Sequence, residues 1–177
     1  MAATCGVCGE THDGDTRHAR MSLPDPILRI DEWERDERAW VGEAAAVLRD
    51  DGRERFFVRA LLELPIEGEE GYFRYGSWIE VSPEDFEVLD ELWPDEDAWR
   101  SRPFSGTLAN ELPPYAFTEG LPAQLRLREV RVLPHVELDE TDHELVRAQR
   151  NGISAHRAHQ LAETLSRVRP ARARTTR

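Results

Sequence analysis

Lysine is absent from this sequence, and all 23 basic residues are arginine, a composition that by itself indicates no mechanism. Cysteine is scarce, with two residues, which excludes a scaffold held together by several disulfides. No stretch approaches the roughly 20 apolar residues of a membrane-spanning helix, and the start lacks the charged and apolar regions of a secretion signal. We therefore expect a cytoplasmic protein without a membrane partner. Its 177 residues can bury a hydrophobic core without disulfides.

Charge is distributed unevenly along the chain. The net charge is −12, but residues 147–177 contain eight arginines and one glutamate, so the first 146 residues carry −19. An acidic body repels nucleic acid and anionic membranes. The basic end is more typical of a solvated helix face followed by a disordered tail, residues 170–177, than of a nucleic-acid site. An unknown protein partner or small ligand is the better expectation.

Alternating apolar residues and turn signals predict several strands. Asp50-Asp51-Gly52 predicts a hairpin turn between strands at 44–49 and 55–64. Residues 72–81 alternate as a half-buried strand, although Trp78 indicates that the second face is partly covered too. A further strand region spans 123–138. The phase of its apolar residues slips at Arg128-Glu129, which predicts a bulge or tight bend.

Helix signals lie between and after these strands. Ser82-Pro83 predicts a helix start, followed by Phe86, Leu89 and Trp93 at helical spacing. Two more helices are expected after Thr141 or Asp142 and after Ser154, and shorter signals predict an extended linker over 21–32 and a helix over 32–42. The sequence thus predicts one α+β domain over 21–169, with a mostly antiparallel sheet and helices packed on one side.

A separate N-terminal segment, residues 1–20, contains both cysteines and is too poor in apolar residues to form a core. Cys5 and Cys8 have the spacing of a zinc knuckle, and His12 follows at a usable distance. His143 is the distant candidate for a fourth ligand, and His18 is the local one. Free thiols and a redox pair are the alternatives, although no strand precedes Cys5 as in redox motifs. If zinc binds, we expect it to be structural.

Two other groups of residues are candidates for function. His143 lies among acids and arginines, including Arg147, where it has the chemistry of a general base; helix capping and surface ion pairs are the favoured interpretation. Aromatic residues near glycines, Tyr75, Trp78 and Tyr115, together with Arg147, are candidates for a ligand or partner groove. Packing in the core is the favoured alternative for the aromatic residues.

Four segments occur in a recognisable order: CGVCGETH at 5–12, FFVRALLELP at 56–65, YGSW at 75–78 and TDHELVRAQRNGIS at 141–154. Together they resemble the bacterial Domain-of-Unknown-Function 2199 family, from Cys5 to about Leu165. The resemblance implies a conserved bacterial domain and supplies no reaction. Because the sequence contains no complete catalytic motif, a non-enzymatic binding module with a structural metal knuckle is the preferred hypothesis. A small metal-dependent enzyme that uses the Cys/His cluster is the alternative.

Overall fold

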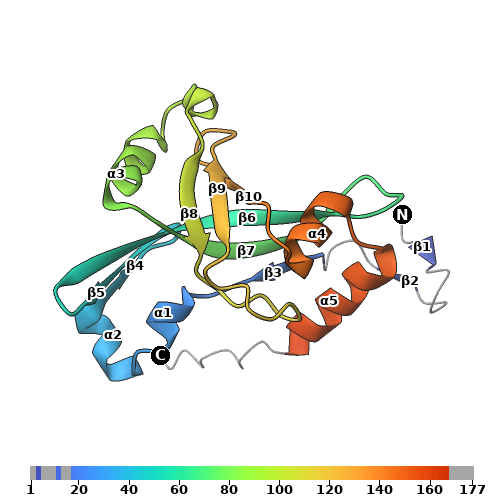
Figure 1. Cartoon of the computed structure of the whole chain (residues 1–177), viewed down its shortest axis with the longest axis horizontal. Helices are drawn as coiled ribbons and strands as arrows, with labels where there is room; N and C mark the ends of the chain where they lie inside the picture. Colours follow the sequence, from blue (N-terminus) through green and yellow to red (C-terminus); the bar gives the residue numbers. More distant parts are fainter. Residues whose placement is uncertain (1–2, 5–10, 13–16, 168–177) are drawn as a thin grey trace, which may run out of the picture.

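The computed structural model describes residues 3–4, 11–12 and 17–167 (Figure 1). In this part of the chain the main sheet has eight strands: β3 (His18–Arg20), β4 (Ala39–Val41), β5 (Ala45–Asp50), β6 (Arg53–Pro65), β7 (Tyr72–Val81), β8 (Phe104–Leu108), β9 (Pro122–Arg126) and β10 (His135–Leu138). A separate antiparallel pair joins β1 (Ala3–Thr4) and β2 (Thr11–His12). The helices are α1 (Asp25–Leu28), α2 (Glu32–Arg38), α3 (Pro83–Leu92), α4 (Glu144–Asn151), α5 (Ala155–Arg167) and the 3-10 turn η2 (Ala98–Arg100).

The long β6–β7 hairpin is the centre of the fold. It pairs antiparallel from Phe56 with Val81 to Pro65 with Tyr72. The preceding β5–β6 turn consists of Asp51 and Gly52, whose φ angles of 46° and 77° are both positive. Such angles are those of a two-residue hairpin turn, and an Asp-Gly pair adopts them readily. The hairpin predicted between the strands at 44–49 and 55–64 is therefore confirmed as the β5–β6 hairpin.

Five strands close into a barrel. Strands β8, β9 and β10 run across the β6–β7 ribbon in Figure 1, and each pairs antiparallel with the next. At one end β8 pairs antiparallel with β7. At the other end β10 pairs parallel with β6, through His135 beside Leu61 and Val136 beside Leu62. The closed order is thus β6–β7–β8–β9–β10, with β3 added in parallel to β7 and β5–β4 added to β6.

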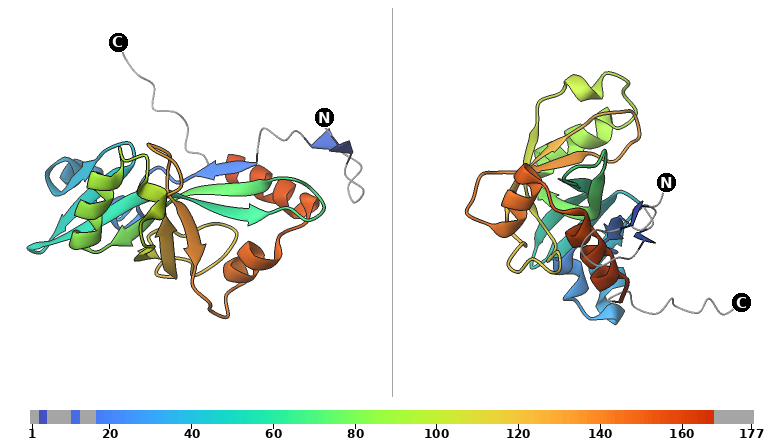
Figure 2. Two further views of the ribbon diagram at one scale, coloured as in Figure 1. Left: turned by 90° about the horizontal axis from the view of Figure 1, so that it is seen from above. Right: turned by 90° about the vertical axis from the view of Figure 1, so that its right-hand side faces the viewer.

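The prediction of an α+β domain is confirmed, and most strand pairings in the main sheet are antiparallel. The sheet is nevertheless not a plain antiparallel one, because β10 pairs parallel with β6 and β3 with β7, and the expectation of helices on one side is wrong. The sheet is mixed and partly closed on itself, and the views in Figure 2 show helices around different sides of the ribbon. The strand region predicted over 123–138 is in fact two strands, β9 and β10, because the chain reverses after Arg126. The slip at Arg128-Glu129 falls in that reversal.

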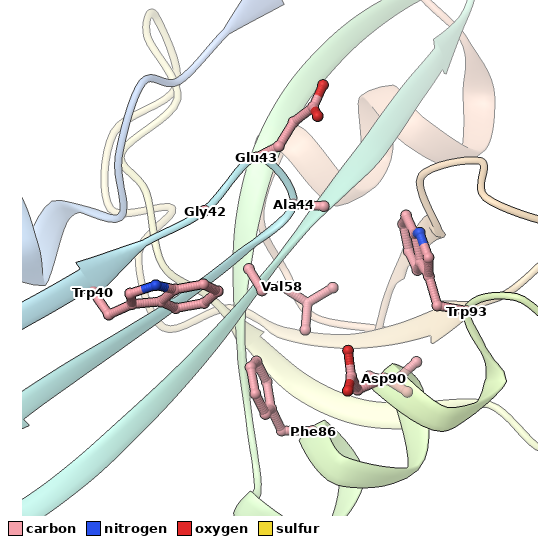
Figure 3. Close-up of a pocket in the computed structure, with 10 residues that line it drawn as sticks. Trp40, Gly42, Glu43, Ala44, Val58, Phe86, Asp90 and Trp93 are labelled. Atoms are coloured by element: carbon pink, nitrogen blue, oxygen red, sulfur yellow. The ribbon is translucent and has the colours of Figure 1, made fainter.

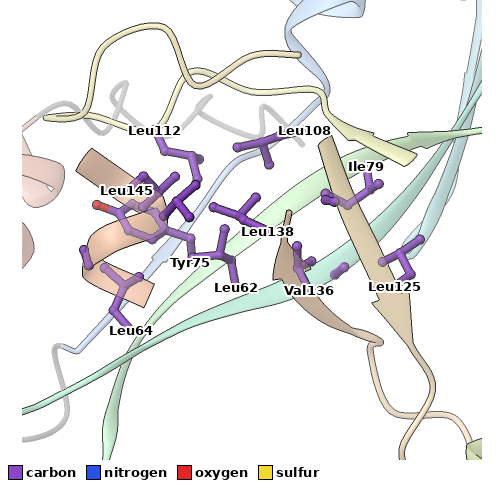
Figure 4. Packing of buried hydrophobic residues seen from close by; sticks show 14 of the residues in the cluster. Leu62, Leu64, Tyr75, Ile79, Leu108, Leu112, Leu125, Val136, Leu138 and Leu145 are labelled. Atoms are coloured by element: carbon purple, nitrogen blue, oxygen red, sulfur yellow. The ribbon is translucent and has the colours of Figure 1, made fainter. Parts of the chain in front are cut away.

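The alternation in β6 and β7 separates two hydrophobic clusters. The inner-face residues Val58, Leu62 and Leu64 of β6 join the barrel core together with residues from β9, β10 and α4 (Figure 4). The outer-face residues Phe57 and Trp78 are fully buried in a second cluster, which contains Ile27, Ala46, Leu48 and Ala109. Full burial of one large apolar side chain contributes about 1.5–3 kcal/mol. Trp78 predicted that the second face of the strand at 72–81 is partly covered. This prediction is confirmed, because that face packs into a second, smaller hydrophobic core.

Local signals account for most helix ends. The Ser82 hydroxyl accepts a hydrogen bond from the Asp85 amide at 3.1 Å and caps α3 as predicted. The cap of α4 is His143, not Thr141 or Asp142, and its imidazole accepts from the Leu145 amide. The linker predicted over 21–32 contains the short helix α1, and α2 ends at Arg38 where β4 begins. None of the helices in the described part of the chain is long and apolar enough to cross a membrane.

Candidate functional site

An open, largely apolar groove lies between the β4–β5 turn and α3 (Figure 3). Its volume is about 250 Å³. Three elements supply its walls: the turn after β4, the inner face of β6, and one side of α3. The lining residues are Trp40, Gly42, Glu43, Ala44, Ala45, Val58, Phe86, Leu89, Asp90 and Trp93. We refer to this set as the Trp40 groove.

Helical spacing places the α3 wall of the Trp40 groove. Phe86, Asp90 and Trp93 recur at intervals of four and three residues, so they share one side of the helix. Leu89 on the same side is buried in the barrel core and fixes the helix against the sheet. Phe86 packs against Phe56 with ring centroids 5.0 Å apart, which holds its ring at the base of the groove.

The opposite wall is Trp40 of β4, which pairs with Val47 of β5. The Trp40 indole remains 55% exposed although it lines the groove. Gly42 leaves space for it, because a Cβ at that position would lie 3.0 Å from Cη2 of the Trp40 ring. The turn closes through a hydrogen bond from the Gly42 amide to the Ala45 carbonyl at 2.8 Å. An alanine at this position would therefore push the indole away from the turn by a few tenths of an ångström.

Two carboxylates, Glu43 and Asp90, border this apolar surface, and both side chains are exposed. Neither carboxylate has a hydrogen-bond or ion-pair partner among the residues that the structure describes. In Figure 3 the Asp90 carboxylate lies between Phe86 and Trp93, while Glu43 stands at the turn on the opposite rim. The Trp40 groove thus combines aromatic surface with two carboxylates, of which Glu43 also interacts electrostatically with the buried Arg59. Its lining contains no histidine, cysteine or hydroxyl nucleophile.

A second polar cluster surrounds the buried carboxylate of Glu63 on the outer face of β6. The Glu63 oxygens lie 2.7 Å from Arg74 Nε, 3.6 Å from an Arg128 nitrogen and 3.3 Å from His135 Nδ1. The last contact lacks hydrogen-bond geometry, so His135 Nδ1 is buried without a hydrogen-bond partner. Burial lowers the pKa of His135, and the nearby Arg128 lowers it further, against the opposite effect of Glu63. Three basic side chains around one buried carboxylate are the arrangement of a structural ion-pair network.

Arg59 is the other buried charge on the outer face. Its guanidinium lies 4.4 Å from the centroid of the Trp78 ring and donates to the Ser22 carbonyl at 3.1 Å. The Trp78 indole donates to the Met21 carbonyl at 3.2 Å. Burial lowers the pKa of Arg59, because its charged form loses water contacts. These contacts fasten residues 21 and 22 to the ribbon, which is a structural role.

The residues predicted as metal ligands are only partly described. Cys5 and Cys8 lie outside the described residues, and His12 is described only through its backbone in β2. His18 is an exposed residue of β3. In residues 3–4, 11–12 and 17–167 no three or more Cys, His, Asp or Glu residues are grouped as a metal site. The zinc knuckle therefore stays a prediction.

His143 is engaged in local structure. Its Nδ1 accepts from the Leu145 amide at 3.1 Å, and its Nε2 lies 2.9 Å from the Ala116 carbonyl oxygen. The Nδ1 contact caps the start of α4, and the Nε2 contact holds this helix start against the loop before β9. Arg147, from the same predicted constellation, pairs with Asp142. These contacts fit the capping interpretation of this segment.

The predicted aromatic groove residues are divided between the two cores. Tyr75 and Tyr115 are buried in the barrel core, where the Tyr75 hydroxyl donates to the Pro113 carbonyl at 2.9 Å. Burial raises the pKa of both phenols. Trp78 lies in the second cluster on the outer face. The structure thus brings the two tyrosines together and separates them from Trp78.

The family model described as "Uncharacterized protein conserved in bacteria (DUF2199)" matches residues 4–153. The chain belongs to this family. No curated protein and no solved structure matches the chain. The span matched by DUF2199 contains the five barrel strands, the whole Trp40 groove and both cysteines, whereas α5 begins after it.

Sequence reasoning missed the groove in this DUF2199 chain because it assigned Trp40 to a helix. Trp33, Glu37 and Trp40 have helical spacing, but the helix ends at Arg38 and Trp40 belongs to β4. A usable signal was present on the other wall. Phe86, Leu89 and Trp93 were expected on one side of a helix, and Asp90 shares that side. Which strand they face depends on tertiary packing and not on the local pattern.

Proposed function

We propose that this member of DUF2199 is a non-enzymatic binding module whose binding site is the Trp40 groove. The observation that carries the proposal is the exposed Trp40 indole opposite Trp93, on an apolar surface bordered by unpaired carboxylates. Tryptophan dominates the energetics of protein interfaces, because one indole buries a large area at low entropic cost. A protein partner is therefore the preferred ligand, and the cytoplasm is the expected location.

The proposal includes a structural zinc knuckle formed by Cys5, Cys8 and His12. His18 is the preferred fourth ligand, because both nitrogens of His143 already contact the backbone. Metal analysis of untagged wild-type protein beside Cys8→Ser tests this part: we expect stoichiometric zinc in the wild type and a large loss in the variant. Equal zinc in both proteins, or none in the wild type, contradicts it.

Site-specific photocrosslinking in the native cells tests the binding function. A photoreactive phenylalanine derivative placed at Trp40 keeps an aromatic ring in the groove and reports on its occupant, and the same amino acid at Trp33 is the matched control. Trp33 is 75% exposed on α2 and does not line the groove. We expect a discrete adduct from position 40 that weakens when Phe86→Ala removes the base of the groove.

Equal adducts from positions 40 and 33, or no adduct from position 40, would contradict a binding role for the groove. Unfolding measurements on Phe86→Ala are needed beside the crosslinking, because Phe86 also packs on Phe56. A second substitution, Trp93→Phe, keeps an aromatic ring and a similar fold. It is expected to change the adduct yield without a loss of stability that explains the change.

A further inference from the structure

The residues of the Trp40 groove point to the chemistry of its occupant. We infer that the groove receives the side chain of an arginine in a basic segment of a partner protein. This inference rests on the proposed function and adds the partner's charge and residue type. It follows from three observations: the aromatic walls, the two carboxylates without a direct ion pair, and the small volume.

Trp40 and Trp93 stand on opposite sides of the groove in Figure 3, with Phe86 below them. A guanidinium binds aromatic faces through both cation–π attraction and planar stacking, and tryptophan is the best partner. The chain already uses this contact twice with tryptophan. Arg59 lies 4.4 Å from the Trp78 ring centroid, and Arg100 lies 4.9 Å from that of Trp99. Among the described residues no guanidinium lies over the ring of Trp40 or Trp93, although the Arg131 amide donates to the Trp93 carbonyl at 3.2 Å.

The charge of the groove has the sign that an arginine requires. Within the described part of the chain, neither Glu43 nor Asp90 forms a direct ion pair. Glu43 interacts with the Arg59 cation only through a longer-range attraction, and Asp90 has no such interaction among the described residues. A second cavity, of about 400 Å³ near α1 and α2, makes a useful contrast. Its arginines Arg29, Arg38 and Arg55 each pair with an acid, so its charges are already matched. The acidic body around the groove also favours the encounter with a basic segment.

The size of the groove favours one side chain over a larger molecule. A volume of about 250 Å³ lies just below the range of roughly 300–1,000 Å³ that is typical of small-molecule sites. Val58 and Leu89 supply apolar surface for the aliphatic part of an arginine, while the guanidinium reaches the carboxylates. One arginine thus satisfies the apolar walls and the negative rim together.

Two capped pentapeptides test the inference. The first is acetyl-Gly-Ala-Arg-Ala-Gly-amide, and the second has citrulline, the neutral isostere of arginine, in the central position. The readout is the indole N–H signals of the protein in NMR titrations at low salt, with Trp40 and Trp93 assigned through phenylalanine substitutions. The buried Trp78 indole is an internal control. We expect the arginine peptide to move the Trp40 and Trp93 signals and to bind roughly tenfold more tightly than the citrulline peptide.

The paired variant Glu43→Gln with Asp90→Asn should abolish this preference. Glu91→Gln is the matched control, because Glu91 is an exposed acid of α3 outside the groove lining. Equal binding of the two peptides would overturn the arginine assignment and leave the binding function intact. The arginine assignment would also be overturned if neither peptide moved the Trp40 and Trp93 indole signals. The same holds if the paired variant still bound the arginine peptide more tightly than the citrulline peptide. The crosslinking at position 40 judges the proposed function separately, whatever the peptides do.

Discussion

On the inner face of β6, Val58, Ala60, Leu62 and Leu64 are buried without any polar group among them. On the outer face of the same strand, Arg59 and Glu63 are buried to a similar extent, at 5% and 8% exposure. The inner face depends on volume and shape, which are insensitive to pH and salt. The outer face depends on the partners of each charge, since a buried charge without partners is costly.

The alternation of residues along β6, and not the degree of burial, therefore separates the apolar inner face from the outer face with its buried charges. One strand contributes an apolar layer to the barrel, and on its outside it places the buried charges Arg59 and Glu63 beside the apolar Phe57. Substitutions on the two faces should therefore fail in different ways. Inner-face variants should lose stability at every pH, whereas variants of the buried ion-pair network around Glu63 should change the dependence of stability on pH.

The largest expected effect is that of Leu62→Ala. Leu62 is fully buried in the barrel core, so its truncation leaves a cavity and should cost about 2–5 kcal/mol of unfolding free energy. Leu61→Ala is the matched control, because Leu61 is adjacent but only half-buried on the outer face. Urea unfolding at several pH values measures both. An equal loss of unfolding free energy in Leu62→Ala and Leu61→Ala would contradict the difference between the two faces of β6.

A smaller effect is expected from Gly106→Ala in β8. An added Cβ would lie 2.4 Å from the Glu80 carbonyl oxygen and 2.7 Å from Ile79 Cγ2, so backbone must shift. Overpacking of this kind costs about 1–3 kcal/mol. Gly76→Ala in β7 is the control, since its nearest atom would be at 3.6 Å and its φ is not in the left-handed region. Thermal unfolding of the two variants should differ clearly, and equal losses would contradict the close approach of β8 to β7.

The smallest effect concerns His135. Its pKa in the folded protein is lowered by burial and Arg128, against Glu63 and Glu137, with Arg126 lowering it slightly further. The folded state therefore favours the neutral ring, and this stability is fully present above the unfolded pKa of about 6.5. It is lost as the pH falls from that value towards the lower folded pKa.

His135→Gln removes this titration, so its unfolding free energy should fall less steeply than that of the wild type below about pH 6.5. Parallel urea titrations from neutral to mildly acidic pH measure the difference. Arg49→Ala is a suitable control, because Arg49 forms an exposed pair with Glu54 and is not among the charges that act on His135. Identical slopes for the wild type and His135→Gln would show that the ring does not contribute.

Local chemistry in the sequence predicted much of this fold. Asp50-Asp51-Gly52 identified the β5–β6 hairpin, and Ser82 identified the start of α3, since both signals act between near neighbours. Trp78 correctly indicated that the second face of β7 is covered. The parallel pairing of β10 with β6 was not predictable in this way, because alternation reports which face is buried and not which strand is adjacent.

The candidate site was less accessible to sequence reasoning. Its two walls come from β4 and α3, which are separated by the whole β5–β7 segment. The spacing of Trp33, Glu37 and Trp40 suggested one helical side, although α2 buries none of its residues. Spacing without a core to pack against is weak evidence for a helix face. The groove depends on where two distant elements meet, and a single sequence does not contain that information.

The pairing of His135 with Leu61 and of Val136 with Leu62, which joins β10 to β6, also limits the order in which the chain can fold. Their partners are separated in sequence by β7, α3, β8 and β9, so ring closure brings together segments of high contact order. The β6–β7 hairpin is local and can form as soon as both strands have left the ribosome. The pairing of β10 with β6 can form only after Val136 has been synthesised. Until then, the backbone of β6 at Leu61 is an unpaired strand edge that can pair wrongly with another strand.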